Sequence, residues 1–212
     1  MADLVIRGAT IVDGTGAPAR TGDVAVKDGV LTEVGGRVGD TGNRELNGDG
    51  LLLTPGWVDI HTHYDGQVTW DPEVTPSSWH GATTVVMGNC GVGFAPVRPD
   101  GRDFLIELME SVEDIPGTAL HEGITWEWES FPEYLDAIGN SRFALDIGAQ
   151  VPHGALRGYV MGERGGDHTE MPSTDEIARM GALAAEGIRA GALGFSTSRT
   201  VNHKSKNGSY TP

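Results

Sequence analysis

The segment PGWVDIHTH, residues 55–63, decides how the chain is interpreted. A run of leucines precedes it, and its Pro-Gly pair breaks that run before residues 57–60, which are typical of a short buried strand. His61 and His63 follow this strand, two residues apart. Because side chains at positions i and i+2 of an extended chain point to the same side, both imidazoles project into one space. The spacing indicates a divalent-metal site, although two polar residues at the exit of a strand would give the same pattern.

The composition restricts the classes of partner. The chain has 212 residues, of which 38% are hydrophobic and 21% charged, as in an ordinary soluble globular protein. Its formal net charge of -15 argues against nucleic acid or an anionic membrane as a partner, because both need basic surfaces. We expect neither a membrane span nor a signal peptide, and therefore a cytoplasmic protein. The single cysteine, Cys90, excludes an internal disulfide and is either a buried apolar residue or a functional thiolate.

The first 54 residues are predicted to form a separate, small β domain. Short alternating stretches such as residues 23–27 and 30–34 are joined by glycine turns, and Asp28-Gly29 between them is typical of a β-hairpin. We expect this part of the chain to be structural.

From residue 57 onward, the pattern changes to apolar strands that alternate with helices. Ser173 and Glu176 have the spacing of a capping box, and the helical periodicity of residues 177–190 follows them. Such an alternation predicts parallel β/α units. Strands are expected at residues 57–60, 83–87, 143–151 and 192–196, and shorter helices at 100–112 and 131–138.

In parallel β/α folds the functional groups gather at the C-terminal ends of the strands. This rule selects His61 and His63 after the first strand and Cys90 after the second. A thiolate is a soft ligand that suits zinc. We therefore interpret Cys90 as a zinc ligand rather than as core filling.

Two segments resemble a known family. Residues 55–63 resemble the first barrel strand of the amidohydrolase superfamily, and residues 81–91, GATTVVMGNCG, resemble its N-acyl-D-amino-acid deacylase (D-aminoacylase) branch. The resemblance implies an α/β fold in which a small β-rich sandwich domain, residues 1–54, precedes the first half of a (β/α)8 TIM-like barrel, residues 55–212. A closed barrel needs ~250 residues, and one β/α unit takes ~30 or more. We therefore expect the barrel to be truncated at residue 212.

The resemblance also implies roles for individual residues. Cys90 would hold one tightly bound zinc ion, and His61 and His63 would belong to a second, weaker metal position. The family's two further histidine ligands and its catalytic aspartate match no residue here. We therefore expect the acid/base aspartate beyond Pro212 and no activity from residues 1–212 alone.

A third segment, residues 151–157, is similar to the family's Gly-His-x-x-Leu-Arg motif, with Pro152 in place of the glycine. His153 and Arg157 in this segment are candidates for substrate binding, and the alternative is that they hold a loop by hydrogen bonds. The remaining histidines, His203 among them, follow no predicted strand end and are expected at the surface or in loops.

Together these features predict zinc-dependent hydrolysis of the amide bond of small N-acyl-D-amino acids by a metal-activated water, with proton transfer by a carboxylate. One alternative is a cyclic-amide or carbamoyl hydrolase, similar to hydantoinases and dihydroorotases. Those relatives bridge two metals with a carboxylated lysine, whereas Lys27, Lys204 and Lys206 end no predicted barrel strand. Another alternative is a non-catalytic scaffold of the same fold. A homo-oligomer is compatible with each of these functions.

Overall fold

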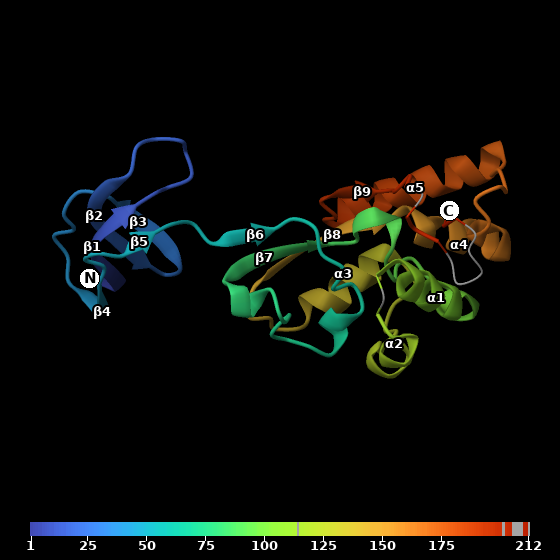
Figure 1. The fold of residues 1–212 in the computed structure, drawn as a ribbon, viewed down its shortest axis with the longest axis horizontal. Coiled ribbons are helices and arrows are strands. Elements are labelled where there is room, and N and C mark those ends of the chain that lie inside the picture. Colours follow the sequence, from blue (N-terminus) through green and yellow to red (C-terminus); the bar gives the residue numbers. More distant parts are fainter. Residues whose placement is uncertain (114, 201, 205–209, 212) are drawn as a thin grey trace. The chain divides into compact units, whose positions relative to one another are not determined.

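The computed structural model describes residues 1–113, 115–200, 202–204 and 210–211. The chain divides into two compact units, Met1–Gly56 and Trp57–Pro212 (Figure 1). None of the described helices combines the length and the apolar composition that a membrane crossing needs.

The first unit is one five-stranded sheet built around β1 (Ala2–Ile11). β2 (Arg20–Lys27) lies antiparallel on one side of β1, and β4 (Gly42–Asn47) lies parallel on the other. β3 (Val30–Val34) extends the sheet beyond β2, and β5 (Leu52–Leu53) pairs with the end of β1. All five described strands of this unit belong to one sheet.

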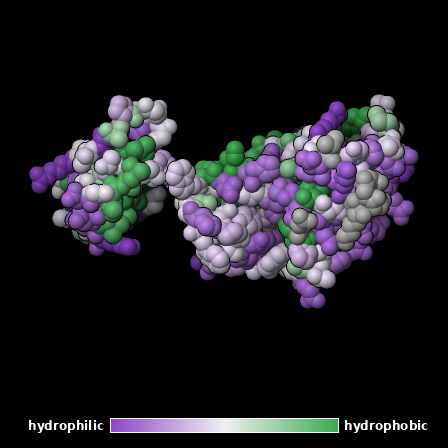
Figure 2. Space-filling model, viewed as in Figure 1, coloured by the Kyte–Doolittle hydropathy of each residue, from purple (hydrophilic) through white to green (hydrophobic). Residues whose placement is uncertain are grey.

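The turn between β2 and β3 is the predicted hairpin. Asp28 and Gly29 both have positive φ, 51° and 75°, as the tight turns that match the twist of a hairpin require. β3 is exposed along its whole length, and Figure 2 shows hydrophobic residues gathered on the surface of this unit.

The second unit contains a parallel four-stranded sheet in the order β6-β7-β8-β9 (Figure 1). Its registers are parallel throughout, so the predicted parallel arrangement is confirmed. The third strand begins three residues later than the sequence pattern suggested. The strands are β6 (Trp57–Asp59), β7 (Ala82–Met87), β8 (Asp146–Pro152) and β9 (Gly194–Ser196).

The helices lie in the two longer connections of the second unit. Between β7 and β8 the chain forms α1 (Arg102–Glu113), α2 (Gly117–Gly123) and α3 (Phe131–Gly139). Between β8 and β9 it forms α4 (His153–Met161) and α5 (Thr174–Ala190). Short 3-10 turns occur at Gln67–Thr69, Ser78–His80, Asn89–Gly91, Pro99–Gly101 and Gly162–Gly166.

The predicted capping box of α5 is present, whereas α2 and α4 were not predicted. The Ser173 hydroxyl accepts a hydrogen bond from the Glu176 backbone N–H at 3.3 Å, and the Glu176 carboxylate accepts one from the Ser173 N–H at 2.7 Å. α4 begins at His153, directly after β8 ends at Pro152, so no loop separates the two elements.

One face of the sheet is buried under the helices of the second unit. Tyr134 of α3 is 1% exposed, and its hydroxyl donates to the backbone carbonyl of Asp65 at 2.8 Å. The prediction that residues 57–60 are buried is wrong for this chain: Trp57 is 69% exposed and Ile60 71%. The reason is that β6 is an edge strand, with β7 as its only neighbour in the described sheet.

Candidate metal centre

The chain turns sharply where β7 ends, at Gly88-Asn89-Cys90. Gly88 (φ 76°) and Cys90 (φ 54°) both adopt left-handed backbone conformations. A side chain at Gly88 would overlap the backbone carbonyl oxygen of Gln150, so only glycine allows this turn to lie so close to β8. The buried Asn89 amide donates to the carbonyls of Thr62 and Val86, at 3.2 and 2.9 Å. These contacts fix the turn beside the end of β6.

The structure brings together the three predicted ligands. The Nε2 atom of His61 lies 3.2 Å from the Sγ atom of Cys90, and the rings of His61 and His63 are 5.4 Å apart. One donor atom from each of the three residues lies within 4.8 Å of the other two. Zinc bond lengths of ~2.0–2.3 Å place neighbouring donors of a tetrahedral site ~3.5 Å apart. Two nitrogens and one sulfur at these separations fit a zinc ion.

The local electrostatics put the His63 imidazole in the form that binds metal. Burial, followed by the nearby His61 and His203, lowers the pKa of His63 to about 4, so its ring is neutral at pH 7. Its Nε2 lies 3.2 Å from a carboxylate oxygen of Glu113, a contact that at this pH is a hydrogen bond from a neutral ring. Its Nδ1 is buried and has no hydrogen-bond partner within the described part of the chain. A neutral ring that donates through Nε2 keeps Nδ1 as its acceptor nitrogen.

The environment of Cys90 favours the thiol unless a cation is held beside it. Burial raises the pKa of the Cys90 thiol, and the negative charge of Glu113 raises it further. Metal ligation releases the proton of a coordinating thiol, because the thiolate is the ligand. The site thus has the donors for a metal cation.

The sequence did not reveal two further members of this cluster, Glu113 and His203. One donor atom from each of Cys90, Glu113 and His203 lies within 4.8 Å of the other two. His203 lies in an irregular segment, as the loop alternative predicted, but its Nδ1 is buried. Only Glu113 could have been noticed in the sequence. It lies in the last turn of α1, which has no basic residue there, and acidic side chains are unfavourable at the negative C-terminal end of a helix.

Comparison with known proteins gives the same family that the motifs indicated. Residues 44–209 match the sequence model of the amidohydrolase family. The chain belongs to this family. It is 36% identical over 197 residues to N-acyl-D-aspartate deacylase of Alcaligenes xylosoxydans xylosoxydans, a match that covers 92% of this chain and 36% of that protein.

Solved structures agree on the amidohydrolase fold. A crystal structure of D-aminoacylase matches with a TM-score of 0.76 and 32% identity, over 93% of this chain and 38% of that chain. N-acyl-D-glutamate deacylase from Bordetella bronchiseptica, in complex with zinc and a phosphonate inhibitor, matches with a TM-score of 0.74 and 29% identity, over 92% of this chain and 38% of that chain. The amidohydrolase chain therefore spans a little over a third of the length of these relatives.

Of the two predicted substrate-binding residues, His153 lies nearer the metal centre of this amidohydrolase. Its Nδ1 is 3.3 Å from the hydroxyl of Thr197, and its ring packs edge-on against Phe195, with ring centres 5.8 Å apart. A Cβ atom built on Gly91 would lie 3.5 Å from the Cβ of His153, so His153 adjoins the residue that follows Cys90.

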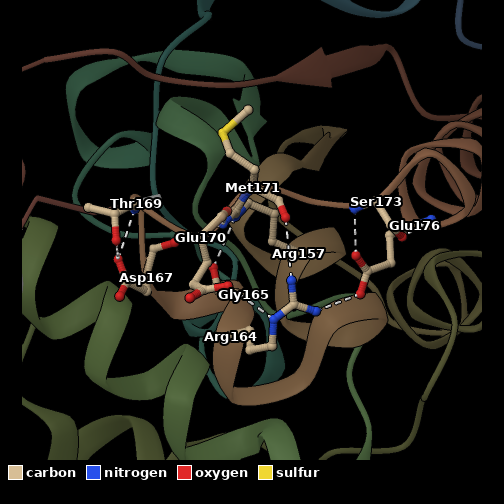
Figure 3. Close-up of polar contacts among 9 residues, drawn as sticks. All are labelled: Arg157, Arg164, Gly165, Asp167, Thr169, Glu170, Met171, Ser173 and Glu176. Carbon is tan, nitrogen blue, oxygen red and sulfur yellow. Dashed lines mark hydrogen bonds and ion pairs between the residues drawn. The ribbon is translucent and has the colours of Figure 1, made fainter.

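Arg157, in contrast, makes its hydrogen bonds to a loop. Its Nε donates to the carbonyl of Gly165 at 3.0 Å, and its Nη2 donates to those of Asp167 and Glu170, at 2.9 and 3.0 Å. Figure 3 shows Arg157 among the residues of this loop. These contacts match the loop-holding alternative. Of the lysines considered for a metal bridge, Lys206 lies outside the described residues, Lys27 ends β2 of the first unit, and Lys204 forms a β-bridge with Tyr210.

A cavity of about 690 Å³ is lined in part by His153, which adjoins the residue after Cys90. His153, Phe195, Thr197 and Arg199 line one part of it, and the loop held by Arg157 contributes Glu170 and Met171 to another. The cavity therefore combines apolar side chains with the guanidinium groups of Arg157 and Arg199, beyond the C-terminal ends of β8 and β9.

We expect Arg157→Met to lower the free energy of unfolding by about 2–3 kcal/mol, because hydrogen bonds to charged groups are each worth ~1.5–3 kcal/mol and three carbonyls lose their donor. Arg164→Met is the matched control in the same loop, where the side chain is 48% exposed and pairs with Glu170 and Glu176 (Figure 3). Surface ion pairs contribute ~0–1 kcal/mol. Urea unfolding followed by circular dichroism measures both, and equal losses would contradict the buried role of Arg157.

Proposed function

We propose that this chain carries the metal-binding part of a zinc-dependent N-acyl-D-amino-acid deacylase, which releases a carboxylate and a D-amino acid. The observation that carries the proposal is the cluster of His61, His63 and Cys90 at the ends of β6 and β7. Two relatives that match over most of this chain are, by their names, deacylases of N-acyl-D-aspartate and of N-acyl-D-glutamate. In this proposal, β6 to β9 are the first four strands of a (β/α)8 barrel, and residues 1–54 are its accompanying β domain.

The donor set explains what the three side chains do. Cys90 supplies the one negatively charged donor as a thiolate, and His61 and His63 supply neutral nitrogens. We assign Cys90 to the tightly held zinc and the two histidines to the adjacent, weaker position. When bound, zinc supplies a hydroxide at neutral pH and polarises the amide carbonyl. None of the described residues is assigned as the carboxylate that transfers the proton.

The cavity beside the centre suits an N-acyl amino acid. Phe195 and Met171 offer apolar surface for the acyl group, and Arg199 offers a positive charge for the α-carboxylate. No side-chain hydrogen bond or ion pair engages Arg199 within the described residues, so its guanidinium is available to a ligand. His153 lines this cavity and adjoins Gly91, the residue after Cys90, and we assign it to contact with the acyl group.

A substrate panel tests the proposal on the protein that contains this chain. After zinc loading, release of D-amino acid is measured from N-acetyl-D-aspartate, N-acetyl-D-glutamate and N-acetyl-D-methionine, beside their L-enantiomers, a hydantoin and dihydroorotate. We expect hydrolysis of at least one N-acyl-D-amino acid, loss of this activity in Cys90→Ala and no change in His121→Ala, which alters an exposed histidine of α2. Turnover of the cyclic amides alone would favour the alternative hydrolase, and equal activity of Cys90→Ala would refute the metal assignment.

A further inference from the structure

Residues 88–91, here called the cysteine turn, have little intrinsic preference for the conformation in which they are found. Cys90 has a φ of 54°, in the left-handed region that a residue with a Cβ atom disfavours. Gly88 and Gly91, with φ of 76° and 77°, are the most flexible type of residue, so they give the turn freedom rather than rigidity. Contacts from elsewhere in the chain must therefore keep the Sγ atom of Cys90 at 3.2 Å from Nε2 of His61.

Ser196, the last residue of β9, contacts the cysteine turn on both sides of Cys90. Its hydroxyl donates a hydrogen bond to the backbone carbonyl of Gly88 and accepts one from the N–H of Gly91 at 3.0 Å. Ser196 is 9% exposed and both glycines are buried, so these backbone groups depend on protein partners. Ser196 lies 105 residues beyond Gly91 in the sequence, and the contact is therefore a product of tertiary packing.

The other contacts of the cysteine turn act on the residue before Cys90. The Asn89 side chain donates to two backbone carbonyls near the ends of β6 and β7, and its Oδ1 accepts a hydrogen bond from the Gln150 side chain at 2.8 Å. The N–H of Gly91 belongs to the peptide bond that follows Cys90, which these contacts leave free to turn. The Ser196 hydroxyl is what orients that peptide bond.

We propose that Ser196 is a positioning residue for the metal centre. Its hydroxyl holds the peptide groups on both sides of Cys90 and so maintains the left-handed conformation that directs Sγ toward His61. Without the hydroxyl, the Gly88 carbonyl and the Gly91 N–H lose this partner, and Cys90 is free to return to a negative φ with its sulfur displaced from His61. This role rests on the proposed function, since it acts through Cys90 as a metal donor.

The place of Ser196 in β9 also connects the cysteine turn to the cavity. Neighbouring residues of a strand point to opposite sides, and Phe195 and Thr197 line the cavity whereas Ser196 contacts the turn. A Cβ atom built on Gly91 would lie 3.3 Å from the Cα atom of Thr197, so the turn packs directly against this end of β9. Ser196 thus fixes Cys90 relative to the wall of the cavity in which we place the substrate.

Cobalt titration of the protein that contains this chain tests the role of the hydroxyl without an activity assay. Co²⁺ occupies zinc sites, and a charge-transfer band between thiolate and cobalt reports its bond to Cys90. We expect Ser196→Ala to bind Co²⁺ ~10–100-fold more weakly, as is usual when a group that orients a metal ligand is lost, and to show a weaker thiolate band. Ser196→Thr keeps the hydroxyl and should bind with an affinity closer to that of wild type than to that of Ser196→Ala.

Thr69→Val is the matched control for loss of a hydroxyl. The Thr69 hydroxyl also contacts two backbone groups, the carbonyls of Gly66 and Gly123 at 2.8 and 3.0 Å, and neither belongs to the cysteine turn. Thr69→Val should bind Co²⁺ with the affinity and the thiolate band of wild type, and urea unfolding compares the stability of all variants. If Ser196→Ala does the same, or if Ser196→Thr binds as weakly as Ser196→Ala, the positioning role is refuted and the proposed function stands. Absence of a thiolate band in wild type would instead refute Cys90 as a donor, and with it the proposed function.

Hydrogen exchange of the wild-type protein gives a second measurement that needs no variant to fold. Coupling between two sites is reciprocal, so if the hydrogen bond from Gly91 to Ser196 favours metal binding, bound metal must favour that hydrogen bond. Zinc loading should therefore slow the exchange of the Gly91 N–H, because exchange requires this contact to open. An exchange rate that zinc leaves unchanged would overturn the proposal.

Discussion

Cys90→Ala should leave the chain without tightly bound zinc. The thiolate is the only charged donor in the described cluster of His61, His63 and Cys90, and its sulfur lies 3.2 Å from His61 Nε2. Loss of an outer partner of a metal ligand reduces affinity ~10–100-fold, and loss of the ligand itself should exceed this. Zinc content after dialysis against a competing chelator measures the effect.

Two further variants make this result specific. Cys90→Asp should retain part of the zinc, because a carboxylate is also a zinc ligand. His63→Ala should retain more zinc than Cys90→Ala, since we assign the histidines to the weaker position. The assignment is reversed if His63→Ala removes all zinc while Cys90→Ala keeps it.

The second large effect is expected at the turn before Cys90. Gly88→Ala should lower the free energy of unfolding by more than ~3 kcal/mol, because a left-handed non-glycine residue costs ~1–2 kcal/mol and the new Cβ also overlaps the Gln150 carbonyl. That oxygen belongs to the backbone of β8 and cannot rotate away. Urea unfolding followed by circular dichroism measures the loss.

Gly81→Ala is the matched control for this prediction. Gly81 has a similar backbone conformation (φ 86°, compared with 76° for Gly88), but a Cβ there meets only Trp57 Cδ1 at 3.8 Å, an ordinary contact. It should lose only the ~1–2 kcal/mol of the backbone term. Equal losses for the two variants would show that the contact with Gln150 is unimportant.

The metal donors at the strand ends were predictable because the signals for them are local. His61, His63 and Cys90 each follow an apolar strand within a few residues, and parallel strands place those ends at the same edge of a sheet. Glu113 and His203 were not predictable in this way. Their positions depend on how the long connection after β7 and the segment after β9 pack, which no short sequence pattern encodes.

Helix α4 was not predicted because two of its residues are glycines that its packing requires. Gly154 and Gly158 lower the helix propensity of this segment. In the structure, a Cβ on Gly154 would lie 2.8 Å from Leu108, and one on Gly158 would lie 2.8 Å from Phe104, both residues of α1. The glycines thus permit close approach of the two helices. The exposure of β6 has the same kind of origin, because an apolar strand is buried only where a neighbour covers it.

The backbone conformation of Cys90 lowers the folding stability of this chain while it keeps a thiolate in the metal centre. With φ at 54°, Cys90 occupies a region that costs a residue with a Cβ ~1–2 kcal/mol, and glycine would occupy it without this cost. Selection for stability alone would therefore replace the cysteine by glycine and lose the thiolate. A residue kept in a strained conformation for the sake of its side chain is a trade-off between stability and activity. Directed evolution of this chain for thermal tolerance alone should accordingly recover Cys90→Gly among its stabilised, metal-free variants.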